Sequence, residues 1–260
     1  MNILILFFIS ALPVVLLGLF VYKKDKNKEP ISLLIKLFVG GILSCFLVLI
    51  VTLIATMIFP ILGADHEELN LFQLLINVFI GIALIEELCK WIISYSISFN
   101  NKHCDEVYDM IIHCVFVSLG FAFFENLLYV IDGGIQVGIM RALLAVPGHV
   151  CDAIFMGYFL GLAKINYVNN DNKKMYKNIS LSILVPTILH GIYDYCLFAQ
   201  NAIFIIIFFI FVITMYVLSL KKVKIISTAN QRFKYNDKFC TNCGTAVNSN
   251  YCPICGRKNI

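Results

Sequence analysis

Long runs of apolar residues, separated by short polar stretches, dominate this chain. A helix rises about 1.5 Å per residue, so about 20 apolar residues are needed to cross about 30 Å of hydrocarbon. Runs of this length fall at seven places, near residues 3–22, 36–61, 71–99, 107–131, 137–163, 179–199 and 201–220. The pattern predicts an all-α fold, a polytopic membrane helix bundle of about seven transmembrane helices.

The composition also indicates a membrane protein, because 60% of the residues are hydrophobic and only 14% are charged. With a mean hydropathy of +0.86, the chain lies far outside the range of soluble globular domains. The first apolar run has its lysines after it and no small-residue cleavage site, so we expect a retained helix rather than a signal peptide. Most of the chain is therefore expected to contact membrane lipid.

The basic residues predict how the chain is oriented in the cell membrane. Lysines crowd into 23–28, 164–177 and the tail from Lys221 onward, whereas the alternate loops at 63–70, 132–136 and 199–201 carry no basic residue. Because cytoplasmic loops are enriched in lysine and arginine, we expect the N-terminus outside and the C-terminus in the cytoplasm. This asymmetry accounts for the net charge of +4, and no nucleic-acid partner is expected.

The composition changes after the last apolar run and divides the chain into three parts. We expect a transmembrane domain at 1–222, a basic linker at 223–237 and a small cysteine-rich module at 238–260. The module contains two Cys-x-x-Cys pairs, each followed by glycine: Cys240, Cys243, Cys252 and Cys255. Four thiolates at this spacing predict a closed tetrahedral site for structural Zn2+.

Two disulfides are the alternative for these cysteines, but the expected cytoplasmic side is reducing and favours the metal. The module resembles the zinc-ribbon tails of many bacterial membrane proteins, and such a cytoplasmic zinc ribbon could bind a cytoplasmic partner. The other cysteines are scattered and are predicted to pack as small apolar residues; they are Cys45, Cys89, Cys104, Cys114, Cys151 and Cys196.

Charged residues interrupt the apolar run at 71–99. Glu86, Glu87 and Lys90 lie there, although each ionised side chain at such depth costs about 2.5 to 3.5 kcal/mol on insertion scales. On a helix Glu86 and Lys90 share a face, whereas Glu87 points about 100° away. The two glutamates therefore need not have one role.

Three later runs add further polar residues, and the first two runs and the last have no acidic residue or histidine. These later residues are Glu125 and Asn126, then Arg141, His149 and Asp152, then His190 and Asp194, the last two on one helical face. Buried polar groups can simply join helices, but that needs neutral donors and acceptors rather than repeated ionisable groups. We therefore expect a functional cavity, with Glu86, His149 and His190 near the membrane midplane and Glu125 and Asp194 nearer the outside.

Such a set of side chains is suited to hydrolysis. A buried glutamate can take a proton from water. Histidines beside it can stabilise a developing oxyanion or bind a metal that activates the same water. Both routes stay open from the residues alone, and so does the choice between Glu86 and Glu87 as general base.

The order of these motifs resembles the PrsW family of intramembrane proteases. The matching motifs are Glu86-Glu-x-x-Lys90, Phe121-x-x-x-Glu125-Asn126, His149 and His190-x-x-x-Asp194. The wider group of CAAX-processing-like membrane proteases has arginine where this chain has lysine, and histidine where it has Glu125. The resemblance implies these essential positions: Glu86, Glu87, Glu125, Asn126, His149, His190 and Asp194, with Arg141 and Asp152 as weaker candidates.

The resemblance further implies a peptidase of regulated proteolysis. Its expected substrate is a single-pass membrane protein, typically an anti-sigma factor, cut at the outer side in a site-1-type cleavage. We expect His149 and His190 to stabilise the oxyanion, with Asp194 orienting His190. Lys90 is expected to pair with a glutamate. A catalytic metal at the membrane site stays open, because both metalloprotease and direct glutamate mechanisms have been described for relatives.

The same residues also bear on other classes of membrane protein. The chain has no His-Glu-x-x-His, Gly-x-Ser-x-Gly or Gly-x-Gly-Asp motif of other membrane proteases. A proton-coupled transporter would also use buried carboxylates, but the ionisable residues cluster in four consecutive runs rather than in symmetric halves. A non-catalytic scaffold with a recruiting zinc ribbon is the third interpretation.

Overall fold

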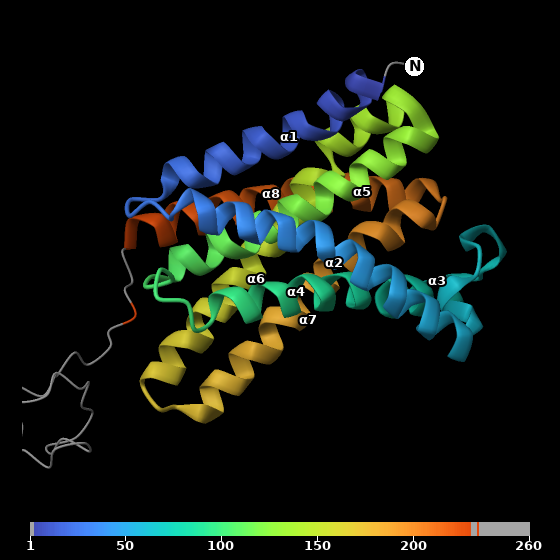
Figure 1. The fold of residues 1–260 in the computed structure, drawn as a ribbon. Coiled ribbons are helices and arrows are strands. Elements are labelled where there is room, and N and C mark those ends of the chain that lie inside the picture. The colour runs from blue at the N-terminus through green and yellow to red at the C-terminus, as the bar shows by residue number, and fades with distance from the viewer. Residues whose placement is uncertain (1–2, 230–232, 234–260) are drawn as a thin grey trace, which may run out of the picture.

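The computed structural model describes residues 3–229 and residue 233, and the described part is helical with no strand (Figure 1). The long helices are α1 (Ile3–Lys24), α2 (Ile31–Ile58), α4 (Ile85–Ser98), α5 (Val107–Leu143), α6 (Ala145–Val168), α7 (Asn172–Phe198) and α8 (Ala202–Ala229). The short elements are η1 (Pro60–Gly63), η2 (His66–Glu68), α3 (Leu71–Ile76) and η3 (Asn77–Leu84). This confirms the all-α prediction.

Six helical segments of the described chain are long and apolar enough to cross a membrane, where about seven were predicted. The difference arises because the runs at 107–131 and 137–163 form one segment, Val107–Val168. That segment is not straight. Gly134 has φ 76° and ψ −166°, a conformation that is essentially restricted to glycine. The chain folds back there, and a Cβ atom on Gly138 would lie 2.8 Å from the Val130 side chain.

The predicted helix at 71–99 corresponds to one spanning segment, Leu71–Ser98, which consists of three joined elements. A π-helical stretch, η3, separates α3 from α4 and ends immediately before the two glutamates of α4. Asn77 at its start donates a hydrogen bond from Nδ2 to the Ile61 carbonyl oxygen over 2.8 Å. Such π-helical turns are rare and occur often at functional sites.

Glycine contacts bring the central helix α5 close to its neighbours. A Cβ atom on Gly41 of α2 would lie 1.9 Å from the Val117 carbonyl oxygen, and one on Gly120 of α5 would lie 1.9 Å from the Phe38 carbonyl oxygen. Small residues allow this close approach of backbones, which favours helix association in membranes. The six scattered cysteines are all free and buried, as expected for packing residues.

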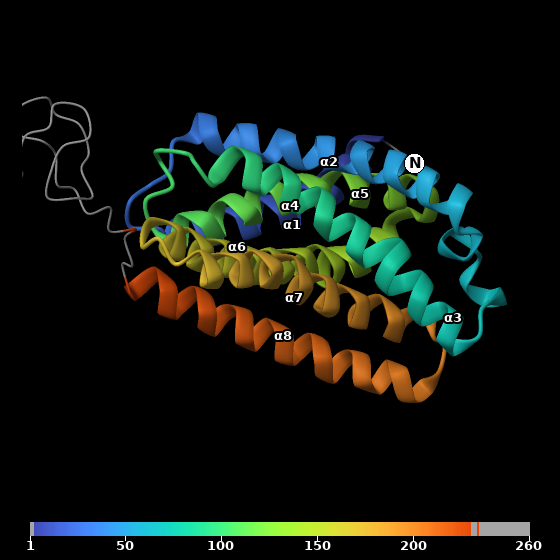
Figure 2. The same ribbon diagram turned by 90° about the horizontal axis from the view of Figure 1, so that it is seen from below.

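The two ends of the bundle gather different loops (Figures 1 and 2). One end holds the α1–α2 and α4–α5 loops, joined by a hydrogen bond of 2.5 Å from Asn27 Nδ2 to Glu106 Oε1. The other end holds the turn at Gly134 and the loop from α2 to α3, and α8 runs along one edge beside α7 (Figure 2). The α6–α7 loop and the end of α8 lie at the same end as the α1–α2 loop, so the basic and the non-basic loops predicted from sequence lie at opposite ends (Figures 1 and 2).

The last helix extends further than expected. α8 continues to Ala229, so the start of the predicted linker at 223–237 belongs to a helix. Phe233 is buried, and its backbone N–H donates to the Asp105 carbonyl oxygen over 2.7 Å. The predicted zinc-ribbon module, with Cys240, Cys243, Cys252 and Cys255, lies outside the described residues.

Candidate active site

A cavity of about 300 Å³ lies among α4, α5, α6 and α7 and reaches the end of the bundle that holds the Gly134 turn. At that end His66 stacks on Phe198, with ring centroids 4.1 Å apart. Its ionisable lining comes from four helices and comprises Glu86, Glu125, Arg141, His149, Asp152, His190 and Asp194, with His66 from the loop. The polar residues singled out from separate apolar runs therefore meet in one place.

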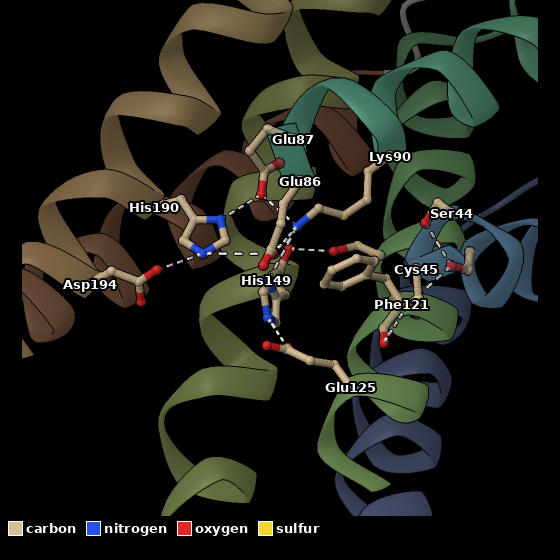
Figure 3. Close-up of polar contacts among 12 residues, drawn as sticks. Ser44, Cys45, Glu86, Glu87, Lys90, Phe121, Glu125, His149, His190 and Asp194 are labelled. Carbon is tan, nitrogen blue, oxygen red and sulfur yellow. Dashed lines mark hydrogen bonds and ion pairs between the residues drawn. The ribbon is translucent and has the colours of Figure 1, made fainter. Parts of the chain in front are cut away.

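Glu87 is the more deeply buried of the two adjacent glutamates. Its side chain is 1% exposed, and it is absent from the cavity lining. Its Oε1 atom accepts a hydrogen bond from Lys90 Nζ over 2.5 Å and lies 2.8 Å from His190 Nδ1 (Figure 3). Glu87 thus joins α4 to α7 through a buried, charged hydrogen-bond network.

Glu86 has different surroundings. It lines the cavity, and its Oε2 atom lies 3.7 Å from Lys90 Nζ and 3.9 Å from His190 Nε2. These are ion-pair distances, and within the described chain this buried oxygen has no hydrogen-bond partner. Lys90 was expected to pair with a glutamate, and it contacts both, with Glu87 at 2.5 Å closer than Glu86 at 3.7 Å.

His149 of α6 connects Lys90 of α4 with Glu125 of α5. Its Nδ1 atom lies 3.3 Å from Lys90 Nζ, and its Nε2 atom lies 2.9 Å from Glu125 Oε2 (Figure 3). The Ser118 hydroxyl donates to the His149 carbonyl oxygen over 2.8 Å, which holds α6 against α5 at this level. Because lysine is only a donor, His149 Nδ1 presents its lone pair to Lys90, and Nε2–H donates to Glu125.

Arg141 reaches the site because the chain folds back at Gly134. Its Nη2 atom lies 2.7 Å from Glu125 Oε2, and its Nε–H donates to Asn126 Oδ1 over 3.2 Å. The guanidinium also stacks 3.9 Å from the centre of the Tyr129 ring. Arg141 was only a weak candidate from sequence, yet it clamps both Glu125 and Asn126.

His190 of α7 is held between two carboxylates. Nδ1 faces Glu87, and Nε2 lies 3.3 Å from Asp194 Oδ2, as the helical spacing of these two residues predicted (Figure 3). The His190 and His149 rings meet edge to face, with centroids 5.2 Å apart. His149 therefore lies between Lys90 and Glu125, and His190 lies between Glu87 and Asp194.

Four buried side chains could hold a metal ion. One donor atom from each of Glu87, His149, Asp152 and His190 lies within 4.8 Å of the others, and we call this set the donor cluster. Asp152 is 4% exposed, and its Oδ1 atom has no hydrogen-bond partner among the described residues. Two imidazoles and two carboxylates suit zinc and similar divalent ions, and carboxylates on the outer histidine nitrogens are typical of such sites. The donor set therefore fits a metal.

The surroundings of Lys90 come partly from α2 and α5. The Lys90 ammonium lies 4.3 Å from the centre of the Phe121 ring, a cation–π contact. Cys45 donates a weak Sγ–H hydrogen bond to the Phe121 carbonyl oxygen over 3.6 Å, next to the glycine contact between α2 and α5 (Figure 3). Phe121 was known only as part of the family motif and Cys45 only as a packing residue, because contacts between helices leave no periodic signal in the sequence.

Comparison with known proteins points to one family. A family model described as "PrsW family intramembrane metalloprotease" matches residues 29–219. A protein of Oceanobacillus iheyensis named Protease PrsW is 36% identical over 215 residues, which cover 82% of this chain and 91% of the relative. Proteins of the same name from Clostridioides difficile and Bacillus subtilis are 33% and 31% identical, over 84% and 72% of this chain and 90% and 80% of theirs. No solved structure gives a significant match.

Proposed function

The chain belongs to the PrsW family and is an intramembrane protease, and we propose that Glu86 acts as the general base of peptide-bond hydrolysis in its cavity. The observation that carries this assignment is the difference between the adjacent glutamates. Glu86 lines the cavity with an oxygen that has no hydrogen-bond partner in the described chain, whereas Glu87 is tied to Lys90 and His190 away from it. A general base needs a free carboxylate oxygen that water and substrate can reach.

In this proposal Glu86 takes a proton from the water whose oxygen attacks the substrate carbonyl carbon. The carbonyl oxygen becomes an oxyanion, which His190 stabilises through Nε2–H, a donor that the oxyanion would share with Asp194. When the C–N bond breaks, Glu86 returns the proton to the leaving nitrogen. His190 Nε2 lies 3.9 Å from Glu86 Oε2, so one substrate group can contact both side chains.

The other residues would position these two. Glu87 at Nδ1 and Asp194 at Nε2 hold His190 in one orientation, and Glu125, which is held by Arg141, does the same for His149. A metal held by the donor cluster would act as a Lewis acid on water or on the substrate carbonyl. Carboxylates that orient ligand histidines commonly change metal affinity or activity by about 10- to 100-fold when removed.

The substrate class and the orientation of the chain are part of the proposal. A cavity among membrane-spanning helices suits a single-pass membrane protein, such as an anti-sigma factor. We assign the end with the Gly134 turn to the outer side of the cell membrane, because the loops at that end carry no lysine or arginine. With two crossings in Val107–Val168, the chain would cross seven times, with its N-terminus outside and its C-terminus in the cytoplasm.

The cysteine-rich module is assigned a structural zinc ion held by Cys240, Cys243, Cys252 and Cys255, and a cytoplasmic partner. Metal analysis of the purified full chain tests this assignment. We expect at least one zinc per chain, and one fewer after Cys240→Ser and Cys255→Ser together. The same zinc content before and after the two substitutions would refute the ribbon.

Cleavage of single-pass substrates by the chain in liposomes tests the catalytic proposal. Glu86→Gln should lower the cleavage rate by about 100- to 10,000-fold, the usual contribution of acid–base catalysis. Glu67→Gln is the matched control, because this glutamate is exposed in the loop near His66. The control should cleave at the wild-type rate. A Glu86→Gln variant that keeps its fold and cleaves within tenfold of wild type would show that Glu86 is not the base.

A further inference from the structure

Lys90 contacts two residues of the donor cluster, each through an atom that could serve as a metal ligand. Its Nζ atom lies 2.5 Å from Glu87 Oε1 and 3.3 Å from His149 Nδ1. From this overlap we propose that the Lys90 ammonium and a divalent cation are alternative occupants of the donor cluster, so that Lys90 competes with metal binding. The inference extends the proposed function of this site, and it concerns metal occupancy rather than the catalytic step.

Charge is the first argument for competition. Three carboxylates surround this point: those of Glu87 and Asp152 are buried, and that of Glu86 is 12% exposed. Carboxylates buried in this way need a compensating cation. Lys90 supplies one positive charge from within the chain. A divalent ion would supply two, but two cations that share Glu87 Oε1 and His149 Nδ1 repel each other strongly where little water screens them.

The state of His149 is the second argument. Lys90 can only donate, so His149 Nδ1 already faces it with a lone pair, and Nε2 lies 2.9 Å from Glu125 Oε2. A metal ligand must offer the same lone pair, with the other nitrogen hydrogen-bonded to a group such as a carboxylate. Exchange of the ammonium for a metal therefore needs no change of tautomer at His149.

Lys90 also has an alternative partner when it leaves Glu87. Glu86 Oε2 lies 3.7 Å from Lys90 Nζ, and this oxygen has no hydrogen-bond partner among the described residues. The Phe121 ring, 4.3 Å from Nζ, faces the ammonium on the side of α5. A small movement of the flexible side chain toward Glu86 would free Glu87 Oε1 and His149 Nδ1 while keeping the lysine charge paired.

Co2+ titration of the full chain tests the competition. The four cysteines of the tail are replaced by serine throughout, so that Co2+ cannot bind to the tail. The affinity for Co2+ is measured by visible absorption and by competition with a chelator, for wild type, Lys90→Gln and Lys90→Arg. Lys164→Gln is the matched control, because Lys164 is also 1% exposed but bonds to the Cys104 and Asn101 carbonyl oxygens, away from the donor cluster.

We expect Lys90→Gln to bind Co2+ at least about 100-fold more tightly than wild type, because a full positive charge leaves a poorly screened site. Lys90→Arg and Lys164→Gln should stay within about threefold of wild type. Lys90→Met is the second variant, in case the amide of Gln disturbs packing, and fluorescence of Trp91 on the same helix reports folding. Equal or weaker Co2+ binding by folded Lys90→Gln and Lys90→Met, or no binding by any variant, would overturn the proposal.

This result is independent of the catalytic assignment. Glu86→Gln should slow cleavage by about 100- to 10,000-fold, yet a Glu86→Gln, Lys90→Gln variant should still bind Co2+ more tightly than Glu86→Gln alone. A failed competition experiment with an inactive Glu86→Gln variant would refute only the role of Lys90. Tighter Co2+ binding by Lys90→Gln, together with a Glu86→Gln variant that still cleaves at nearly the wild-type rate, would refute only the role of Glu86 as general base.

Discussion

The Glu87–Lys90 pair allows a quantitative test of the structure. The two side chains are 1% and 2% exposed, and Oε1 and Nζ lie 2.5 Å apart. Breaking a buried ion pair by removing one partner typically costs about 3 to 5 kcal/mol, because the remaining charge is left without compensation. For Glu87→Leu, Glu86 at 3.7 Å from Nζ can offset part of this cost, and for Lys90→Met, His190 Nδ1 at 2.8 Å from Glu87 Oε1 can do so. We therefore expect about 3 kcal/mol for each variant.

The double variant should be less destabilised than the sum of the single variants. With both charges removed, His190 Nδ1 still loses its partner Glu87 Oε1, which lies 2.8 Å away in the wild-type chain. A buried donor left without a partner costs about 1 to 3 kcal/mol. We therefore expect a coupling free energy of at least about 2 kcal/mol between the two positions.

Unfolding in mixed micelles, followed by fluorescence of Trp91, provides the measurement, since the chain contains one tryptophan. The exposed pair Asp171–Lys174, with 34% and 70% exposed side chains and an ion-pair distance of 2.8 Å, is the control cycle. It should show no measurable coupling, because water screens such pairs. Additive effects at Glu87 and Lys90, with coupling below about 0.5 kcal/mol, would refute the buried pair.

Three further predictions concern the turn, the helix packing and the clamp on Glu125. Gly134→Ala should lower the free energy of unfolding by roughly 1 to 3 kcal/mol, because an L side chain is strained at φ 76°. Gly120→Ala should cost about 1 to 3 kcal/mol, since its Cβ atom would lie 1.9 Å from the Phe38 backbone oxygen. Gly148→Ala, whose Cβ atom would only touch the Tyr193 ring at 3.6 Å, is the control for both, and equal stability of all three variants would contradict these packing arguments. Arg141→Gln should slow substrate cleavage by about 10- to 100-fold while stability changes little, and an unchanged rate would show that the clamp on Glu125 and Asn126 is not needed.

Much of the architecture follows from the sequence because its causes are local. The apolar runs predict membrane-spanning helices, because the length and the composition of a helix largely decide whether it can cross the bilayer. The helical period also placed Asp194 beside His190, at 3.3 Å. The π-helical stretch at Asn77–Leu84 left no such signal, because an unbroken apolar segment reads as an ordinary helix.

The sequence by itself determined that the chain is an all-helical membrane protein and that Glu86, Glu125, His149 and His190 belong to one site, because burying ionisable groups in a membrane without a role is costly. Only the tertiary structure decided which glutamate faces the cavity and that Glu87 is the closer partner of Lys90. The reason is that such distances depend on how helices far apart in the chain pack, through the contact of α2 with α5 and the turn at Gly134. Helical periodicity describes the faces of one helix and carries no information about the neighbours that those faces meet.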